Sequence, residues 1–489
     1  MTRYQPHLSK TRIQNGRQCH KRLWLDVHQR ELAQWGEASQ LRLAQGTAFG
    51  ELAQALLGGG HLVEADYTQS REAQAETQRL LARPRARAPQ IFEAAFEHEL
   101  VRVRVDALRR EPRSDTLIEV KSTTSAKAEH VWDAAIQTWV LRGAGRPVKR
   151  VQIGHLNKDF VYQREGDYEG LLALSDITDA VDDLQPEIPA LVRQLKKVVR
   201  SPIPEITTGA HCSSPYDCPF IGHCQSTEPP QPEYPVTLLP HGGKSVEALL
   251  AEGYRDLREV PEHRFDNPRH RRIAEATRTG KPFVDPALRK AIKALPWPRY
   301  FLDFEAISFP VPRWLGTRPF QQIAFQFSCH VRTSARAKPR HHGYLDTEDS
   351  HPEARVAKRL VDCIGDTGPI LVWNRSFEAQ ILRQMAEAQP KLRKRLLGMV
   401  DRLVDLLPLY REHYYHPEQR GSWSLKAVLP TSAAGLAYEG LEVANGLDAQ
   451  VAYLQLLDGA LSSQEGAALR SSLEKYCLMD TAGLVALLS

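Results

Sequence analysis

The stretch Gly209–Cys224, which reads GAHCSSPYDCPFIGHC, gathers three cysteines in one loop that proline and glycine interrupt. Cys212, Cys218 and Cys224 have five residues between neighbours, and Cys19 lies near the N-terminus in GRQCHKRLWL. Four thiolates are the usual ligands of a structural zinc ion or an iron–sulfur cluster. Separate buried thiols are the alternative, because free cysteine often packs as a small apolar residue. If all four cysteines share one metal centre, that centre closes a first domain near residue 224.

The composition predicts a soluble protein with more than one domain. The chain has 489 residues, of which 42% are hydrophobic and 25% charged, and two or three domains are expected at this length. The net charge of +5 restricts any nucleic-acid-binding surface to a local patch. The seven cysteines are an odd number, and no signal peptide or membrane span is recognisable. We therefore expect a cytoplasmic protein whose clustered cysteines bind metal rather than form disulfides.

Two predicted strands of the first domain carry acidic residues. Residues 99–106 (ELVRVRVD) alternate, with valines on one face and Asp106 on the other, and residues 117–121 (LIEVK) place Glu119 and Lys121 on one face. Asp106 and Glu119 are suited to hold Mg²⁺ or Mn²⁺, which polarises a phosphate and acidifies a bound water. Lys121 would position that water and offset the developing charge. The alternative is an ordinary exposed E-x-K pair on a sheet.

Three helices are predicted around these strands. Residues 8–25 form a helix that begins at Ser9, a residue favoured at N-caps, and residues 46–57 form a helix that carries Glu51. Residues 131–141 (VWDAAIQTWVL) form a helix that places Gln137 shortly after the E-x-K strand.

In this order, Asp106, Glu119-Val-Lys121 and Gln137 resemble the PD-(D/E)XK nuclease superfamily. The flanking cysteines resemble those of its RecB-like branch, which includes CRISPR-associated single-strand exonucleases and the AddB nuclease module. The resemblance spans roughly residues 1–225. It implies a [4Fe–4S] cluster rather than zinc at the four cysteines.

The sequence departs from this family in several places. Val105 stands before the first aspartate instead of proline, and Leu141 stands where the Q-x-x-x-Y motif has tyrosine. The first gap in the cysteine loop is longer than the usual C-x-x-C. Glu51 is the residue that we match to the helix-borne His or Glu of the family.

A second set of acidic residues lies near the C-terminus. Residues 299–306 (RYFLDFEA) predict a strand with Asp303 and Glu305 on one face, and such carboxylates are costly to bury unless a cation meets them. The other pieces follow in order: Asn374 and Glu378 in NRSFE, after a strand over residues 369–373, and Tyr476 and Asp480 in LEKYCLMD. Each piece taken alone is common on protein surfaces.

Taken together, these residues resemble the tyrosine subtype of the DEDD exonuclease family, which has an RNase H-like fold. The resemblance covers roughly residues 296–489. It implies two-metal hydrolysis, in which four carboxylates hold two Mg²⁺ ions and Tyr476 orients the attacking water. The family usually trims nucleic acid from the 3′ end. Glu378 stands where aspartate is usual, and its longer side chain is either absorbed by the backbone or weakens the second metal.

Two further stretches, residues 318–330 (RPFQQIAFQFSCH) and 421–430 (GSWSLKAVLP), resemble a bacterial C-terminal domain of uncharacterised function that is joined to RecB-like nucleases. Lys426 in the second stretch is predicted to contact a phosphate, with a packing or surface role as the alternative. Asn374 is predicted to contact nucleic acid as well.

The sequence therefore predicts an α/β multidomain protein. A restriction-endonuclease-like (PD-(D/E)XK) domain occupies residues 1–225, and a DEDD-type RNase H-like domain occupies residues 296–489. Residues 226–295 form a proline-rich linker, STEPPQPEYPVTLLP, followed by a basic helical spacer. The predicted function is hydrolysis of DNA, as single strands or ends, in repair or in defence against phages and plasmids. The alternatives are a nucleic-acid-binding scaffold with one or both centres degenerate, an RNA-processing exonuclease, and an RNase stabilised by zinc.

Overall fold

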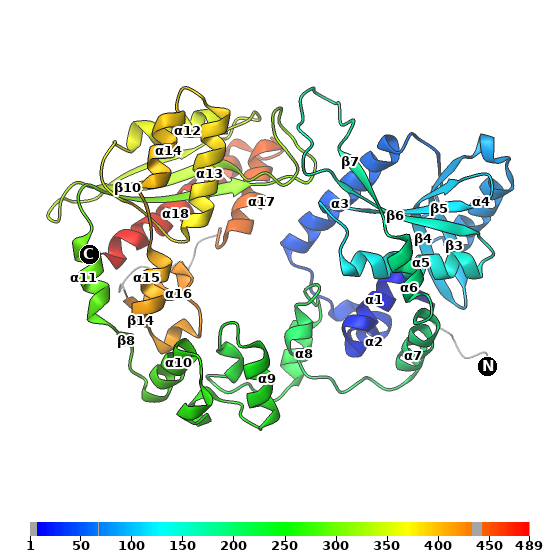
Figure 1. Cartoon of the computed structure of the whole chain (residues 1–489), viewed down its shortest axis with the longest axis horizontal. Helices are drawn as coiled ribbons and strands as arrows, with labels where there is room; N and C mark the ends of the chain where they lie inside the picture. Colours follow the sequence, from blue (N-terminus) through cyan, green and yellow to red (C-terminus); the bar gives the residue numbers. More distant parts are fainter. Residues whose placement is uncertain (1–6, 67, 433–442, 489) are drawn as a thin grey trace. The chain divides into compact units, whose positions relative to one another are not determined.

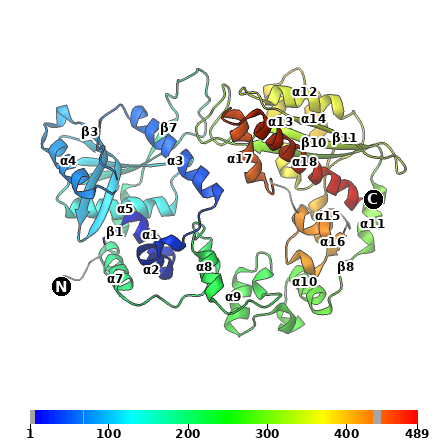
Figure 2. The same cartoon turned by 180° about the vertical axis from the view of Figure 1, so that it is seen from behind.

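The chain folds into two compact units of mixed α/β structure (Figures 1 and 2). The computed structural model describes residues 7–66, 68–432 and 443–488. The first unit comprises residues 1–229 and 309–321, and the second comprises residues 230–308 and 322–489. The short segment 309–321 belongs to the first unit, in which the N–H of Tyr162 donates to the carbonyl of Thr317 at 3.0 Å.

The first unit is built on a seven-stranded sheet in the order β2-β3-β4-β5-β6-β7, with β1 pairing with β4. The β3–β4 and β4–β5 pairs are antiparallel and the β5–β6 pair is parallel. As the alternation predicted, the valines of β4 are buried and the arginines between them are half-buried. The strands are β1 (Leu8–Ser9), β2 (His61–Leu62), β3 (Gln90–His98), β4 (Val101–Arg110), β5 (Asp115–Lys121), β6 (Val148–Leu156) and β7 (Leu172–Asp176).

Helices cover both faces of this sheet. The larger core lies against α1, α4, α5 and α7, while α3 packs on the opposite face. The helix predicted over residues 8–25 is two helices, because Cys19 adopts an extended backbone between them, and Ser9 caps the first as predicted. The helices are α1 (Lys10–Gln18), α2 (His20–His28), α3 (Glu37–Leu56), α4 (Ser70–Ala82), α5 (Ala128–Gly143), α6 (Thr178–Leu184), α7 (Ile188–Arg200) and α8 (Ile221–Thr227).

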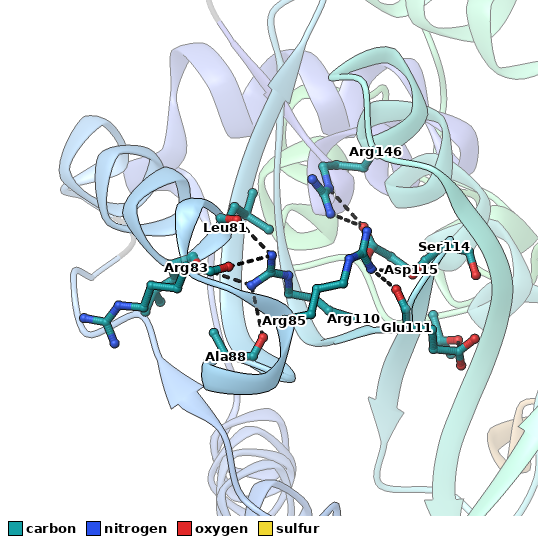
Figure 3. Close-up of polar contacts among 11 residues, drawn as sticks. Leu81, Arg83, Arg85, Ala88, Arg110, Glu111, Ser114, Asp115 and Arg146 are labelled. Carbon is teal, nitrogen blue, oxygen red and sulfur yellow. Dashed lines mark hydrogen bonds and ion pairs between the residues drawn. The ribbon is translucent and has the colours of Figure 1, made fainter.

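A buried charge cluster fixes the start of β5 (Figure 3). Asp115 is fully buried, and it accepts hydrogen bonds from Arg85 at 3.2 Å and from Arg146 Nε at 2.9 Å. Arg110 points its guanidinium instead at main-chain carbonyls, those of Leu80, Leu81, Arg83 and Ala88. The strand is thus held at its first residue, while Glu119 and Lys121 lie at its other end.

The second unit is built on a five-stranded mixed sheet in the order β11-β10-β9-β12-β13. The first three strands are antiparallel, and β9, β12 and β13 are parallel. The predicted alternation in β9 is observed: Tyr300, Leu302 and Phe304 pack into one core, and Asp303 and Glu305 lie on the face that α17 and α18 contact. The strands are β8 (Phe283–Val284), β9 (Arg299–Ile307), β10 (Ile323–Arg332), β11 (Arg340–Leu345), β12 (Ile370–Val372), β13 (Leu403–Asp405) and β14 (Tyr414–Tyr415).

Residues 230–295, which we predicted as a separate linker and spacer, belong to the second unit. Their apolar side chains share one core with α15, α16 and α18, and β8 pairs with β14. No described helix combines the length and apolar character needed to cross a membrane. The helices of this unit are α9 (Gly243–Ala251), α10 (Pro268–Thr279), α11 (Pro286–Ala294), α12 (Glu353–Cys363), α13 (Arg375–Ala388), α14 (Arg393–Asp401), α15 (Leu406–His413), α16 (Leu425–Ser432), α17 (Gly446–Leu457) and α18 (Ser463–Leu487).

Candidate active centres

The first candidate centre lies where β4, β5 and α5 meet. The β4–β5 ladder ends beside Asp106 and Glu119, and α5 packs against both strands. Glu119 is 1% exposed, and the fully buried Gln137 donates through Nε2 to its Oε2 at 2.6 Å. The N–H of Val120 donates to Asp106 Oδ2 at 2.6 Å. The structure therefore brings together the acids and the glutamine that the sequence singled out.

Two lysines neutralise Glu119. Lys121 Nζ lies 2.8 Å from Glu119 Oε1 and 2.7 Å from Asp133 Oδ2. Lys10 Nζ, from the first residue of α1, lies 2.5 Å from the same Glu119 oxygen. Lys10 and Asp133 were missed by the sequence analysis. Asp133 precedes Gln137 by one helical turn, which was a usable signal, whereas nothing local places the start of α1 beside β5.

Charge is unevenly balanced in this centre. Burial, followed by repulsion from Glu119, raises the pKa of Asp106 to about 7. Burial acts to raise the pKa of Glu119 as well, but the ammonium groups of Lys10 and Lys121 outweigh it and hold that pKa below its usual range. Glu119 is therefore ionised, whereas at Asp106 the two lysines and the Val120 N–H do not outweigh burial and repulsion.

Glu51 lies at the edge of the same site. It is exposed on α3, and it lines an open cleft together with Asp106, Lys121, Arg42 and other residues of α3. The cleft has a volume of about 570 Å³. Glu51 thus shares a solvent space with the centre, whereas the hydrogen-bonded cluster is formed by the other residues.

All four cysteines line one cavity. Cys19 lies at the junction of α1 and α2, and the other three, Cys212, Cys218 and Cys224, are buried. None of the four forms a disulfide. Gln18 joins the two segments, because its Nε2 donates to the carbonyls of His211 at 2.7 Å and Tyr216 at 2.6 Å. The N-terminal helices and the cysteine loop therefore meet at this cavity.

The lining of the cavity includes a buried cation. Arg22 is 7% exposed, and its Nε has no hydrogen-bond partner in the described chain. The thiol groups of Cys218, Cys19 and Cys212 act on the guanidinium of Arg22, which is placed to offset thiolate charge in this cavity.

The second candidate centre lies on β9. The ligand atoms of Asp303, Glu305 and Cys477 lie within 4.8 Å of one another, and Cys477 Sγ donates to Asp303 Oδ2 at 3.8 Å. Asp480, from α18, and Glu378, from α13, lie close enough to repel the Asp303 carboxylate. Four carboxylates from three separate elements therefore converge, as the sequence order suggested.

Burial and mutual repulsion disfavour the ionised form of the carboxyl groups in this centre. Burial, followed by repulsion from Asp480, Glu305 and Glu378, raises the pKa of Asp303 well above its usual range. Burial and the Asp480 carboxylate raise the pKa of Glu305 to about 8, and burial raises the pKa of Glu378 to about 8 as well. A cation would relieve this repulsion, so the group is suited to bind one.

Glu378 reaches the centre in spite of its unusual length. It is 2% exposed, and its Oε2 has no hydrogen-bond partner among the residues that the structure describes. Asn374 lies one turn earlier, with an exposed side chain and a left-handed backbone at the N-cap of α13 (φ 78°). Its N–H donates to Asp405 Oδ1 at 3.1 Å. Asp405, which the sequence analysis missed, thereby fixes the start of the helix that carries Glu378.

Tyr476 and Lys426 are paired. Lys426 Nζ donates to the Tyr476 hydroxyl at 3.2 Å. Because an ammonium group only donates, the phenol oxygen accepts here, and its own O–H can donate to a different acceptor. Burial, followed by the carboxylates of Asp480 and Glu305, raises the pKa of Tyr476, so the phenol stays protonated at neutral pH. Lys426, predicted to contact a phosphate, lies against this tyrosine.

Cys477 is a member of this cluster that the sequence analysis missed. It is fully buried, directly after Tyr476 in LEKYCLMD. Its spacing of three residues from Asp480 places both on one helical face, which was a usable signal.

The comparisons with known proteins do not assign this chain to a family. Residues 300–424 match a domain of unknown function, DUF2779, and this range holds Asp303, Glu305 and Glu378 but not α18. The solved structure titled "Crystal structure of SSO0001" is similar at 13% identity and a TM-score of 0.26, over 47% of this chain and 91% of that chain. No curated protein matches the chain.

Proposed function

We propose that this protein is a metal-dependent nuclease with two active centres. In this proposal the first unit is a RecB-like PD-(D/E)XK nuclease with an iron–sulfur cluster, and the second is a DEDD-type, RNase H-like 3′→5′ exonuclease. The observation that carries the proposal is the convergence of Asp303, Glu305, Glu378 and Asp480 from β9, α13 and α18 into one buried cluster.

The donor set of the second centre fits Mg²⁺ or Mn²⁺. These are hard cations that take oxygen ligands, and Glu378 Oε2 is a buried carboxylate oxygen without a partner in the described chain. Asp303, Glu305, Glu378 and Asp480 would hold the ions. When bound, the two metals supply an activated water and stabilise the leaving oxygen of the phosphodiester.

The chain's own residues would act around this metal pair. Tyr476 keeps its proton, and Lys426 occupies one lone pair of its oxygen, so the phenol O–H is available to orient water or a phosphate oxygen. Lys426 is also the cation that lowers the pKa of Glu305. It therefore favours the ionised carboxylate that metal binding requires.

The first centre fits a single hard cation at adjacent carboxylates. Asp106 and Glu119 would hold it, and the bound ion would polarise a phosphate and lower the pKa of water. Lys121 lies against Glu119 and would offset negative charge that develops on the phosphate. Glu51 is positioned in the adjoining cleft, where substrate or an outer water would pass.

The four thiols fit an iron–sulfur cluster better than zinc. The choice of the cluster rests on the resemblance of the cysteine pattern to the RecB-like branch, and Arg22 is placed to offset thiolate charge. Purification should therefore give a brown, iron-containing protein that absorbs visible light, whereas a zinc protein would be colourless.

The experiment that tests the proposal digests end-labelled single- and double-stranded DNA and RNA. The proteins are wild type, Glu119→Gln, Asp303→Asn and the double variant, each with EDTA, Mg²⁺ or Mn²⁺. We expect each single variant to lose one activity, the second centre to remove nucleotides from the 3′ end, and EDTA to stop both. Single-stranded DNA is the expected substrate of the first centre, and digestion of RNA alone would favour the RNA-processing alternative. A double variant that cleaves like wild type would rule the nuclease assignment out.

A further inference from the structure

A second recognition element adjoins the carboxylates of the second unit. Beside the centre lies a cleft of about 480 Å³, entirely within this unit. Its walls come from five parts of the chain: the segment before α9, the start of α10, the end of β12, α15, and the loop before α16. Its lining residues are Pro240, His241, Arg269, Trp373, Asn374, Leu407, Arg411, Gly421, Ser422, Trp423, Ser424 and Leu425.

The cleft is lined by basic, polar, aromatic and aliphatic residues, and none of the lining residues is acidic. Arg269 and Arg411 supply two guanidinium groups, and neither forms an ion pair with a described carboxylate. Arg269 lies over the ring of Trp423, with 5.8 Å from its Cζ to the ring centroid. Ser422 and Ser424 add exposed hydroxyls. The cleft therefore offers cations, hydrogen-bond donors and aromatic faces together.

The cleft is joined to the centre at two points. Asn374 lines it, and Glu378, one turn later on α13, lies in the carboxylate cluster. Ser424 lines it as well, and Lys426, two residues later, donates to Tyr476. A ligand in the cleft is thus within one helical turn of the catalytic groups along either segment.

The shape of this wall is built into the backbone. A Cβ at Gly421, whose φ is +79°, would lie 1.9 Å from the carbonyl oxygen of Leu238. His270, buried on α10, contacts the carbonyl of Pro240 at 2.9 Å through its Nε2. These contacts hold residues 238–241 against the loop that carries the serines. The stretch predicted as a spacer is therefore one wall of the cleft.

We propose that this cleft binds the single nucleic-acid strand whose 3′ end enters the carboxylate centre. Arg269 and Arg411 contact backbone phosphates, and the half-buried Trp373 offers its ring face to a base. Arginine suits phosphate because its planar fork donates two hydrogen bonds, and aromatic faces accept any base. The inference rests on the proposed exonuclease function and adds the place where the strand is held.

The test uses the full chain carrying Glu119→Gln, so that only the second centre cleaves, and follows oligothymidylate and oligouridylate degradation with Mg²⁺. Arg269→Ala and Arg411→Ala should each raise KM about tenfold with kcat nearly unchanged. The salt dependence of kcat/KM should also fall, by about 0.7 in log–log slope per lost phosphate contact. Ser422→Asp, which adds a negative charge to the exposed wall, should weaken binding as well. Arg271→Ala is the matched control, because Arg271 is exposed on the same helix and donates to the carbonyl of Phe265.

Arginine variants that behave like Arg271→Ala would overturn the cleft assignment. A second readout separates this failure from failure of the nuclease proposal itself. A strand with a photoreactive base near its 3′ end, bound to the uncleaving Glu119→Gln/Asp303→Asn protein, should crosslink to residues 373–374 or 421–425. If the strand crosslinks to these residues but no variant cleaves, the cleft is a strand-binding site and the exonuclease proposal is wrong. If the crosslinks are confined to other segments, the cleft assignment is wrong.

Discussion

The two centres differ in how neighbouring groups balance the charge of their buried carboxylates. In the first, Glu119 is met by Lys10 at 2.5 Å and Lys121 at 2.8 Å, and its pKa is held low although it is buried. In the second, Asp303 and Glu305 are surrounded by further carboxylates, and burial and repulsion raise their pKa values. The first centre has two lysines against its glutamate, whereas in the second centre Lys426 is the one cation among the described residues that acts on Glu305, and it does not outweigh burial and repulsion.

The same contrast occurs away from the centres. Asp115 in the first unit is fully buried between Arg85 and Arg146 (Figure 3). Glu353 in the second unit is also fully buried, but neither of its oxygens has a hydrogen-bond partner in the described chain. The basic group paired with it is the imidazole of His351, whose Nε2 lies 3.5 Å from Oε2 and whose pKa burial lowers. Two buried acids with opposite charge balance should therefore respond differently to mutation and to pH.

The largest expected effect is at Asp115. Asp115→Ala should lower the free energy of unfolding by about 3–5 kcal/mol, because it leaves Arg85, Arg146 and the nearby Arg110 without their shared counter-charge. Chemical denaturation measures this. Asp182→Ala is the control, because the Arg142–Asp182 pair is exposed and its loss should cost less than about 1 kcal/mol. Equal effects of the two substitutions would contradict the contrast.

Substitution of Glu353 should stabilise the protein, in contrast to substitution of Asp115, and by an amount that depends on pH. Burial raises its pKa from 4.5 to about 7, so the unfolded chain loses this proton first and the stability falls as pH rises from about 4.5 to 7. Glu353→Gln should therefore stabilise the protein by up to about 3 kcal/mol at pH 8 and by almost nothing at pH 4. Denaturation of both proteins across this pH range measures the difference. A gain that is constant with pH would show that the effect is packing and not charge.

The sequence was sufficient where one element carries the signal. The alternation in β4 and β9 identified the buried faces, and the spacing of Glu119 and Lys121 placed both in one cluster, since period-two geometry is local. The i, i+4 spacing of Tyr476 and Asp480 is local in the same sense.

Contacts between distant segments were not predictable in this way. Lys10 reaches Glu119 across 109 positions, and Asp405 holds the start of α13 from the end of another strand. The helix break at Cys19 was missed because residues 8–25 have no proline to mark it. Residues 230–295 were interpreted as a spacer from their composition, which does not show that their apolar side chains pack with α15 and α18.

A smaller effect should distinguish the second centre by its response to metal. At one hundred times its dissociation constant, a bound Mn²⁺ stabilises the folded state by about 2.7 kcal/mol. Hydrogen exchange of β9 and α18 peptides should therefore slow when Mn²⁺ is added to wild type. Asp303→Asn should lose this response to Mn²⁺, because it removes one of the carboxylates that would hold the ion. Glu119→Gln is the control and should keep that response.

The smallest expected effect tests whether Lys10 serves as a built-in cation of the first centre. Its ammonium lies 2.5 Å from Glu119 Oε1, where it competes with a metal ion for that oxygen. Lys10→Met should therefore tighten Mn²⁺ binding about tenfold, or about 1.4 kcal/mol, because Glu119 keeps only one ammonium partner. Calorimetric titration in the Asp303→Asn background, where the second centre is weakened, measures this affinity. Lys10→Arg, which retains the charge, should bind Mn²⁺ like its parent. If Lys10→Met weakens Mn²⁺ binding instead, Lys10 orients Glu119 for the metal rather than replacing it, and the two centres would then share a dependence on external cations.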